Sequence, residues 1–179
     1  MRSITYAKNG NFSFKLTPGN AEDNYGQAAK YFKEQLTGRI GFECSFGVTS
    51  EVKTVSFGSM LQSPTHYYSP ALRYDVQNEK IEYRNSAGTY TEIDDVSLGY
   101  VDNTGIANII KLVVDFNTNY YLRGYLNEDE FDLSTYAIQE TANEVSPFIN
   151  NYVYATNNST GVHSLYIDNI IITQNEPYT

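Results

Sequence analysis

The sequence is poor in the residues that build the commonest metal and redox sites. Among its 179 residues there are one Cys and two His, and there is no Trp. A lone Cys44 can form neither an internal disulfide nor a cysteine-based zinc site. Because Cys44 lies in a stretch of alternating apolar residues, we expect it to be a small side chain of the core. The composition therefore excludes a disulfide scaffold and a zinc ribbon.

Positive charge is also scarce. Lys and Arg together number 12 against 21 Asp and Glu, so the net charge is −9. An acidic chain without a basic stripe repels a phosphate backbone, which excludes nucleic acid as a partner. No apolar run approaches the roughly 18 residues that span a bilayer, so we expect no membrane insertion. The first residues, MRSITYAKNGNFSF, lack the apolar stretch of a signal peptide, although this alone does not assign the protein to the cytoplasm.

What the sequence does contain is alternation of apolar and polar residues. The segment 38–48 places Ile40, Phe42, Cys44, Phe46 and Val48 on one face of a strand. The same pattern predicts strands at 11–16, 71–76, 78–84, 107–116, 120–126 and 163–173. A tight turn at 77–78 would join the second and third of these, and the turn at 117–119 would join the fourth and fifth. About ten short strands indicate an antiparallel two-sheet sandwich, and residues 1–179 are expected to form a single domain.

Two segments depart from this pattern. Residues 26–36 are built of helix-forming residues, with Ala29, Phe32 and Leu36 near a helical spacing, so they favour a helix. A short strand followed by a turn at 33–38 is the alternative. Residues 134–149 show no period and are interpreted as a long connection with room for one helical turn, the kind of segment that often carries function.

Four runs together resemble the concanavalin A-like lectin/glucanase jelly roll, and most closely its laminin-G-type and bacterial surface branches. They are GRIGFECSF, LRYDVQNEKIEYRNSAGTY, KLVVDFNTNYYLRGYLN and SLYIDNIIIT, at 38–46, 72–90, 111–127 and 164–173. The resemblance covers residues 10–174 in strand order. It implies an all-β jelly-roll sandwich of two antiparallel sheets, without fixing an activity, since this architecture hosts hydrolases, lyases, lectins and adhesive domains.

The stretch TEIDDVS at 91–97 opens like the catalytic strand of related retaining glucanases, which read Glu-x-Asp-x-(x)-Glu. Glu92 and Asp94 match the first two carboxylates, but Val96 or Ser97 stands where the closing Glu should be. The Trp residues usual in such a sugar cleft are absent as well. We therefore predict no catalytic residue here, and expect Asp95 to end a strand or cap a turn.

Three further acidic or polar groups invite a metal interpretation. Residues 127–132 and 115–119 concentrate the oxygen ligands that Ca²⁺ prefers, but neither spacing matches a defined Ca²⁺ loop. Turns between strands explain both, so no metal or other cofactor is predicted, with Ca²⁺ as the minor alternative. Asp168 and Asn169 interrupt an apolar strand, which predicts a β-bulge.

Strand parity suggests a ligand-binding groove. Tyr121, Arg123 and Tyr125 would share one face of their strand, and Arg73 and Asp75 one face of another. If these strands were neighbours on the concave sheet, their rings and planar polar groups would suit a sugar. Cross-strand pairs that simply stabilise the sheet are the alternative.

The leading functional hypothesis is a non-catalytic domain that binds carbohydrate, where the carbohydrate follows from the family resemblance. Such a domain would belong to a bacterial surface or glycan-utilisation protein, so an extracellular or cell-surface location is favoured. Two alternatives stay open. One is a glycoside hydrolase or polysaccharide lyase whose site was not recognised, with two carboxyl groups at catalytic separation. The other is a structural or protein-interaction domain without a small ligand.

Overall fold

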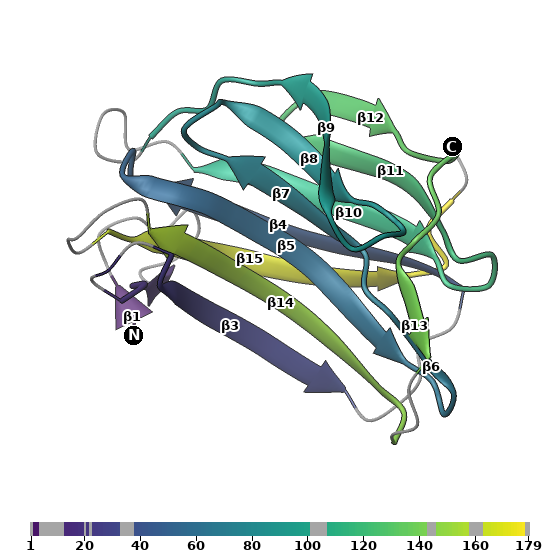
Figure 1. The fold of residues 1–179 in the computed structure, drawn as a ribbon. Helices are drawn as coiled ribbons and strands as arrows, with labels where there is room; N and C mark the ends of the chain where they lie inside the picture. Colours follow the sequence, from purple (N-terminus) through teal and green to yellow (C-terminus); the bar gives the residue numbers. More distant parts are fainter. Residues whose placement is uncertain are drawn as a thin grey trace.

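The computed structural model describes residues 2–3, 13–19, 21, 23–32, 38–100, 107–142, 146–157 and 163–177. Within these ranges the secondary structure consists of strands, which form two antiparallel sheets stacked face to face (Figure 1). The described part of the chain contains no helix that could cross a membrane. The predicted all-β sandwich is confirmed.

The first sheet has seven strands in the order β1-β2-β15-β4-β10-β11-β12. Their bounds are β1 Arg2–Ser3, β2 Ser13–Leu16, β15 Leu165–Gln174, β4 Arg39–Val48, β10 Asn108–Asp115, β11 Tyr120–Leu126 and β12 Asp129–Asp132. The C-terminal strand β15 therefore lies between β2 and β4, far from its neighbours in sequence. Such non-local pairing is typical of jelly rolls.

The second sheet is organised around β5, Val52–Gln62. One edge of β5 pairs along its length with β14, Phe148–Asn157, which in turn pairs with β3, Tyr25–Phe32. Residues 54–58 of β5 pair on the other edge with β7, and residues 61–62 pair with β6. The sheet continues from β7 to β8 and β9, and from β6 to β13. The bounds of these strands are β6 His66–Tyr68, β7 Ala71–Asp75, β8 Lys80–Arg84, β9 Tyr90–Asp95 and β13 Glu140–Ala142.

The core lies between the two sheets and is built by strand alternation. Phe42 and Phe46 of β4 point inward, and the ring of Phe46 lies 4.8 Å from that of Phe57 on β5. Cys44 sits between them in sequence and is fully buried, as predicted, and burial raises the pKa of its thiol. Each fully buried side chain of the size of Val or Phe contributes roughly 1.5–3 kcal/mol to the stability of the fold, so the packing of the two sheets stabilises both.

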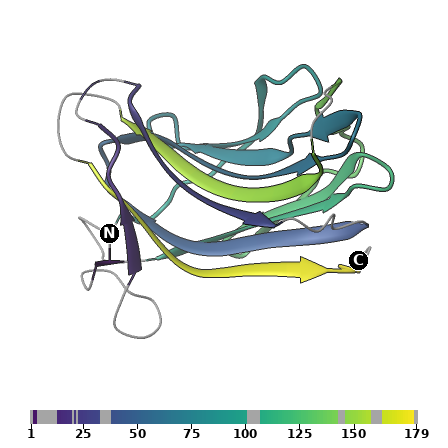
Figure 2. The same ribbon diagram turned by 90° about the horizontal axis from the view of Figure 1, so that it is seen from below.

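Both sheets curve in the same sense, so the outer face of the second sheet is concave and that of the first is convex (Figure 2). On the concave face, outward-pointing residues of β3, β14, β5, β7, β8 and β9 form one continuous surface. The names concave face and convex face are used below for these two outer surfaces.

Most predicted strands are confirmed. The segments at 38–48, 71–76, 78–84, 107–116, 120–126 and 163–173 correspond to β4, β7, β8, β10, β11 and β15. The part of 11–16 that the structure describes forms β2. A register shift between Asp168 and Ile171 confirms the predicted bulge in β15, where Asn169 adopts a φ of 49°.

The predicted helix at 26–36 is wrong. Its described part forms the edge strand β3, which confirms the alternative of a short strand. Residues 33–37 of the turn expected at 33–38 lie outside the described residues. Helix propensity is a weak preference, and here eight residues of β3 pair in register with β14, which overrides it. Ala28 and Phe32 pack against the core from this strand.

The segment 134–149, interpreted as a long connection, carries more structure than expected. It includes the short strand β13 and the beginning of β14. Residues 143–145 between them lie outside the described ranges, and no helical turn occurs in the rest of the segment.

Candidate functional site

The concave face contains a groove of about 330 Å³ where β3, β14, β5 and β8 come together. Its walls are aromatic, amide and guanidinium groups with one thioether. The residues that line it are Tyr25, Gln27, Met60, Arg84, Asn150, Tyr152 and Tyr154. We call this hollow the concave-face groove.

β14 supplies the floor of the concave-face groove. Asn150, Tyr152 and Tyr154 alternate along this strand, so all three point to the concave side. The rings of Tyr152 and Tyr154 lie 5.9 Å apart at an angle of 22°. Tyr152 is 5% exposed, whereas Tyr154 is half-buried, so Tyr154 presents more of its ring to the groove.

Gly58 on β5 makes room for the ring of Tyr152. A Cβ at this position would lie 2.5 Å from the hydroxyl oxygen of Tyr152 and 2.8 Å from the carbonyl oxygen of Pro70. A Cβ does not come this close to an oxygen atom, so any residue other than glycine would have to displace the Tyr152 ring or the backbone at Pro70. Burial raises the pKa of Tyr152, against smaller effects of Ser69 and Arg84 that lower the pKa.

Two polar atoms of the groove are buried without a hydrogen-bond partner in the described part of the chain. They are Oδ1 of Asn150, an acceptor, and Nε of Arg84, a donor. Asn150 is 5% exposed, and Arg84 uses Nη1 to donate a 3.1 Å hydrogen bond to Ser69 Oγ. Leaving buried polar groups unpaired is unfavourable by about 1–3 kcal/mol each. Such atoms in a groove indicate a place where a bound polar molecule would be stabilised.

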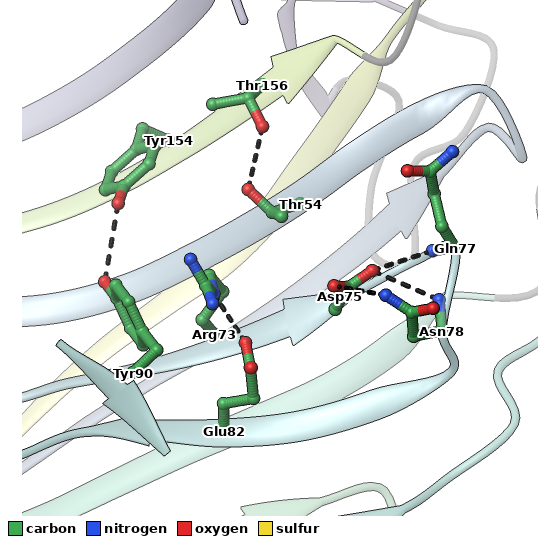
Figure 3. Close-up of polar contacts among 9 residues, drawn as sticks. All are labelled: Thr54, Arg73, Asp75, Gln77, Asn78, Glu82, Tyr90, Tyr154 and Thr156. Carbon is green, nitrogen blue, oxygen red and sulfur yellow. Dashed lines mark hydrogen bonds and ion pairs between the residues drawn. The ribbon is translucent and has the colours of Figure 1, made fainter. Parts of the chain in front are cut away.

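Arg73 and Tyr90 lie on the concave face close to Tyr154, which is one of the residues that line the groove (Figure 3). The guanidinium of Arg73 stacks 3.8 Å above the ring of Tyr90 and forms an ion pair of 2.5 Å with Glu82. The hydroxyls of Tyr90 and Tyr154 are 3.4 Å apart. Burial, followed by the neighbouring phenols of Tyr154 and Tyr152, raises the pKa of Tyr90, so this phenol stays neutral at physiological pH.

Of the residues predicted to bind a ligand, Arg73 and Asp75 lie on the concave sheet, in β7. Arg73 is placed beside the groove as described. Asp75 instead closes the turn after its strand (Figure 3). Its carboxylate accepts hydrogen bonds from the backbone N–H groups of Gln77 and Asn78 at 3.0 and 3.1 Å, and from the Asn78 amide at 2.9 Å. The turn predicted at 77–78 is thus confirmed. The Asp75 carboxylate stabilises this turn through its hydrogen bonds.

The other three predicted residues lie elsewhere, so the expectation of one shared groove is wrong. Their strand β11 belongs to the first sheet, whereas β7 belongs to the second. Tyr121, Arg123 and Tyr125 do not even share a face. A register shift pairs Val113 with Arg123 but Val114 with Tyr121, which makes Leu122 an extra residue and reverses the parity of the strand.

As a result, Tyr121 is fully buried between the sheets, while Arg123 and Tyr125 point to the convex face. Arg123 lies 3.6 Å from the carboxylate of Glu176, which also forms a 2.9 Å ion pair with Lys111. Tyr125 lies opposite Glu130 of β12. The ion pairs of Glu176 with Lys111 and Arg123 hold the segment that follows β15 against the first sheet.

The stretch TEIDDVS forms most of β9 and the residues that follow it. Glu92 is on the concave face, directly opposite Glu82 of β8. Each of the two carboxylates is bound to a cation, Glu92 to Lys80 and Glu82 to Arg73. β9 ends at Asp95, as expected, and the backbone N–H of Asp95 bonds to Asp94 at 2.9 Å.

The two acidic stretches considered as metal ligands have different surroundings. Asp115 accepts a 2.8 Å hydrogen bond from the backbone of Asn117, as in the predicted turn. Residues 128–130 line a hollow of about 490 Å³ together with Asp94 and Asp95. No group of three or more Asp, Glu, His or Cys in the described ranges has the arrangement of a metal site.

The sequence patterns did not identify the central strands of the concave sheet. β5 and β14 were not predicted, and with them Asn150, Tyr152 and Tyr154 were missed. The signal was present, since polar or aromatic residues alternate with Ile149, Val153 and Ala155 in FINNYVYATN. Asn151 at an inward position and Tyr at outward positions weakened that alternation.

No protein-family model matches the sequence, and no curated protein matches it either. Solved structures are similar in fold. A Bacillus licheniformis β-glucanase has 12% sequence identity and a TM-score of 0.57, covering 97% of this chain and 91% of its own. Lectin I-B4 from Griffonia simplicifolia has 10% identity and a TM-score of 0.58, covering 96% and 91%.

A sialidase chain is also similar, with 7% identity and a TM-score of 0.59 over 94% of this chain. This chain spans only 16% of the sialidase. Likeness at these identities concerns the fold alone, a two-sheet antiparallel β-sandwich.

Proposed function

We propose that the protein binds carbohydrate, without catalysis, in the concave-face groove. The observation that carries this proposal is the pairing of unsatisfied polar atoms with aromatic rings. Asn150 Oδ1 can accept a hydrogen bond and Arg84 Nε can donate one, and both residues line the same groove as Tyr152. A sugar hydroxyl both donates and accepts, and the apolar face of a sugar ring packs on a phenol ring.

The fold adds general support. One of the similar structures is a lectin and another is a β-glucanase, so proteins of this architecture act on sugars. The setting that we propose is a cell-surface or glycan-utilising protein of a bacterium. In such a protein, a domain of this kind would bind the polysaccharide. Arg73, beside the groove, is retained as a contact of a longer ligand, in contrast to Asp75, which serves the turn.

A glycoside hydrolase is the second candidate, because Glu82 and Glu92 face each other across β8 and β9 on the concave side. A retaining mechanism uses two carboxyl groups about 5–5.5 Å apart, one of them protonated as the acid. Here both carboxylates are engaged in ion pairs, Glu82 with Arg73 and Glu92 with Lys80. The ion pairs favour binding over hydrolysis.

A glycan array followed by isothermal titration with the best glycan tests the proposal. We expect Tyr154→Ala and Asn150→Ala each to weaken binding by about tenfold, the range typical of central contacts. Tyr125→Ala on the convex face is the matched control and should leave the affinity unchanged. Tyr121 is unsuitable for this test, because its side chain belongs to the core.

Failure of every glycan to bind would overturn the proposal. Release of reducing sugar from a polysaccharide panel, abolished by Glu82→Gln or Glu92→Gln, would replace it with the hydrolase. Equal weakening by Tyr125→Ala and Tyr154→Ala would show that the groove is not the site.

A further inference from the structure

Arg84 differs from the other cations of the concave face. Strand parity places Arg73, Lys80 and Arg84 on this side. Arg73 is paired with Glu82, and Lys80 with Glu92 and Asp95. Arg84 has no carboxylate within ion-pair distance among the described residues, and its hydrogen-bond acceptor is the neutral hydroxyl of Ser69.

The position of Arg84 makes this lack of a counter-charge important. The residue is half-buried in the wall of the concave-face groove, and its Nε is shielded from water without a partner. A guanidinium in such surroundings gains from a negatively charged ligand, because the attraction is stronger away from bulk water. Arg84 is also the one residue among the seven lining residues that is charged at neutral pH.

We propose that the concave-face groove selects a sugar that carries a carboxylate, such as a hexuronic acid residue. The carboxylate would lie against Arg84, a hydroxyl would donate to Asn150 Oδ1, and the sugar ring would pack against Tyr154. This inference rests on the proposed function and narrows it from sugars in general to acidic sugars. Carboxylates are the acceptors with which guanidinium forms its strongest hydrogen bonds.

The charge of the whole chain limits the ligand further. With a net charge of −9, the protein repels densely charged polyanions. The groove is lined by neutral residues and by one Arg without a carboxylate partner among the described residues. It therefore suits a ligand with a single carboxylate, which Arg84 attracts at short range. A sulfated polymer or a nucleic acid would meet the surrounding negative field instead. We therefore expect recognition of one acidic sugar unit.

The test compares matched pairs of ligands that differ in the carboxylate. Methyl β-D-glucuronide is titrated against methyl β-D-glucoside, and methyl α-D-galacturonide against methyl α-D-galactoside, followed by ¹H–¹⁵N chemical shifts of the full chain. We expect the acidic member of at least one pair to bind about tenfold more tightly at low salt, and the preference to shrink as salt rises.

Arg84→Gln should abolish the preference, because it weakens binding of the acidic sugar more than binding of the neutral one. Arg84→Lys retains the charge and should keep part of the preference, which provides a second variant if Arg84→Gln folds poorly. Lys80→Gln is the control, since it removes the same charge from the same sheet face, and it should leave the preference intact.

Equal binding of acidic and neutral sugars would overturn this inference and leave the proposed function standing. An unchanged preference in Arg84→Gln would also overturn it. Absence of binding to any sugar, neutral or acidic, would overturn both proposals together.

Discussion

The hydroxyl of Tyr121 donates a 2.7 Å hydrogen bond to the backbone carbonyl of Arg84, so a side chain of the first sheet holds the backbone of the second beneath the groove. The same hydroxyl accepts a 3.0 Å hydrogen bond from the backbone N–H of Ala71 on β7. Tyr121 thereby ties two neighbouring segments of the concave sheet to the core. It is a positioning residue for Arg84, which it contacts from the side opposite the groove.

Replacing Tyr121 with Phe should destabilise the fold by about 1–3 kcal/mol, because it removes both hydrogen bonds from a buried site while keeping the ring. The free energy of unfolding in urea measures the change. Tyr120→Phe removes the same hydroxyl from a neighbouring side chain that is 42% exposed, and should change the stability by less than about 0.5 kcal/mol. Similar losses in the two variants would contradict the bridging role of Tyr121.

Gly58→Ala should destabilise the protein by about 1–3 kcal/mol and weaken ligand binding, because the added methyl group displaces the ring of Tyr152. Thermal unfolding and glycan titration measure the two effects. The double variant Gly58→Ala/Tyr152→Ala separates the causes. If the clash with Tyr152 is responsible, the methyl group should have a much smaller effect when the ring is absent. Additive effects would show that Pro70 accounts for the loss.

The buried phenols predict a loss of stability in alkali. Burial raises the pKa values of Tyr74, Tyr90, Tyr121 and Tyr152 above the ordinary value of 10.0. Above pH 10 the unfolded chain therefore releases protons that the folded chain keeps, so stability falls as pH rises. The contribution is fully present below pH 10. Absorbance of tyrosinate at 295 nm should show these phenols ionising together with cooperative unfolding, and independent ionisation without unfolding would contradict this.

Glu176 predicts a loss of stability in acid. Burial raises its pKa, but hydrogen bonds from Thr173 and Lys111 and the charges of Lys111 and Arg123 outweigh this and leave the pKa below the ordinary 4.5. The unfolded chain then binds a proton before the folded one. The stabilisation is therefore full above pH 4.5 and is lost as pH falls through the lowered pKa.

Glu176→Gln should reduce stability at pH 7 and flatten the acid limb of the curve of unfolding free energy against pH. Glu51→Gln makes the same change in an exposed turn and should preserve the acid limb. A curve for Glu176→Gln that runs parallel to that of the unmodified protein would show that Glu176 contributes nothing to acid sensitivity.

Strands whose outward faces are polar were predictable from the sequence. In β4 the inward Phe42, Cys44 and Phe46 alternate with shorter or polar residues. This alternation indicates a strand with its apolar face toward the core. The hairpin of β7 and β8 was found for the same reason, since Arg73 and Glu82 alternate with Leu72, Tyr74 and Ile81. Its turn residues add a local signal that does not depend on the rest of the fold.

The residues of the groove were harder to predict. On the concave face, Tyr152 and Asn150 point outward yet are buried, because neighbouring strands of a curved sheet crowd their side chains. Buried polar and aromatic residues on both sides of β14 blur the contrast that identifies a strand from sequence. The helix formers of β3 misled for a related reason, since an edge strand takes its conformation from the partner with which it pairs.

The sequence by itself determined the all-β architecture, the hairpins and the acidic character of the chain, because side-chain alternation, turn residues and charge act over a few residues. Only the tertiary structure decided which faces meet. One extra residue, Leu122, turns Tyr121 into the core and Arg123 away from it, and sheet order separates both from Arg73. The groove around Arg84 is assembled from four strands that lie far apart in the chain. Their adjacency follows from hydrogen-bonded pairing and core packing over long sequence separations, which local patterns do not encode.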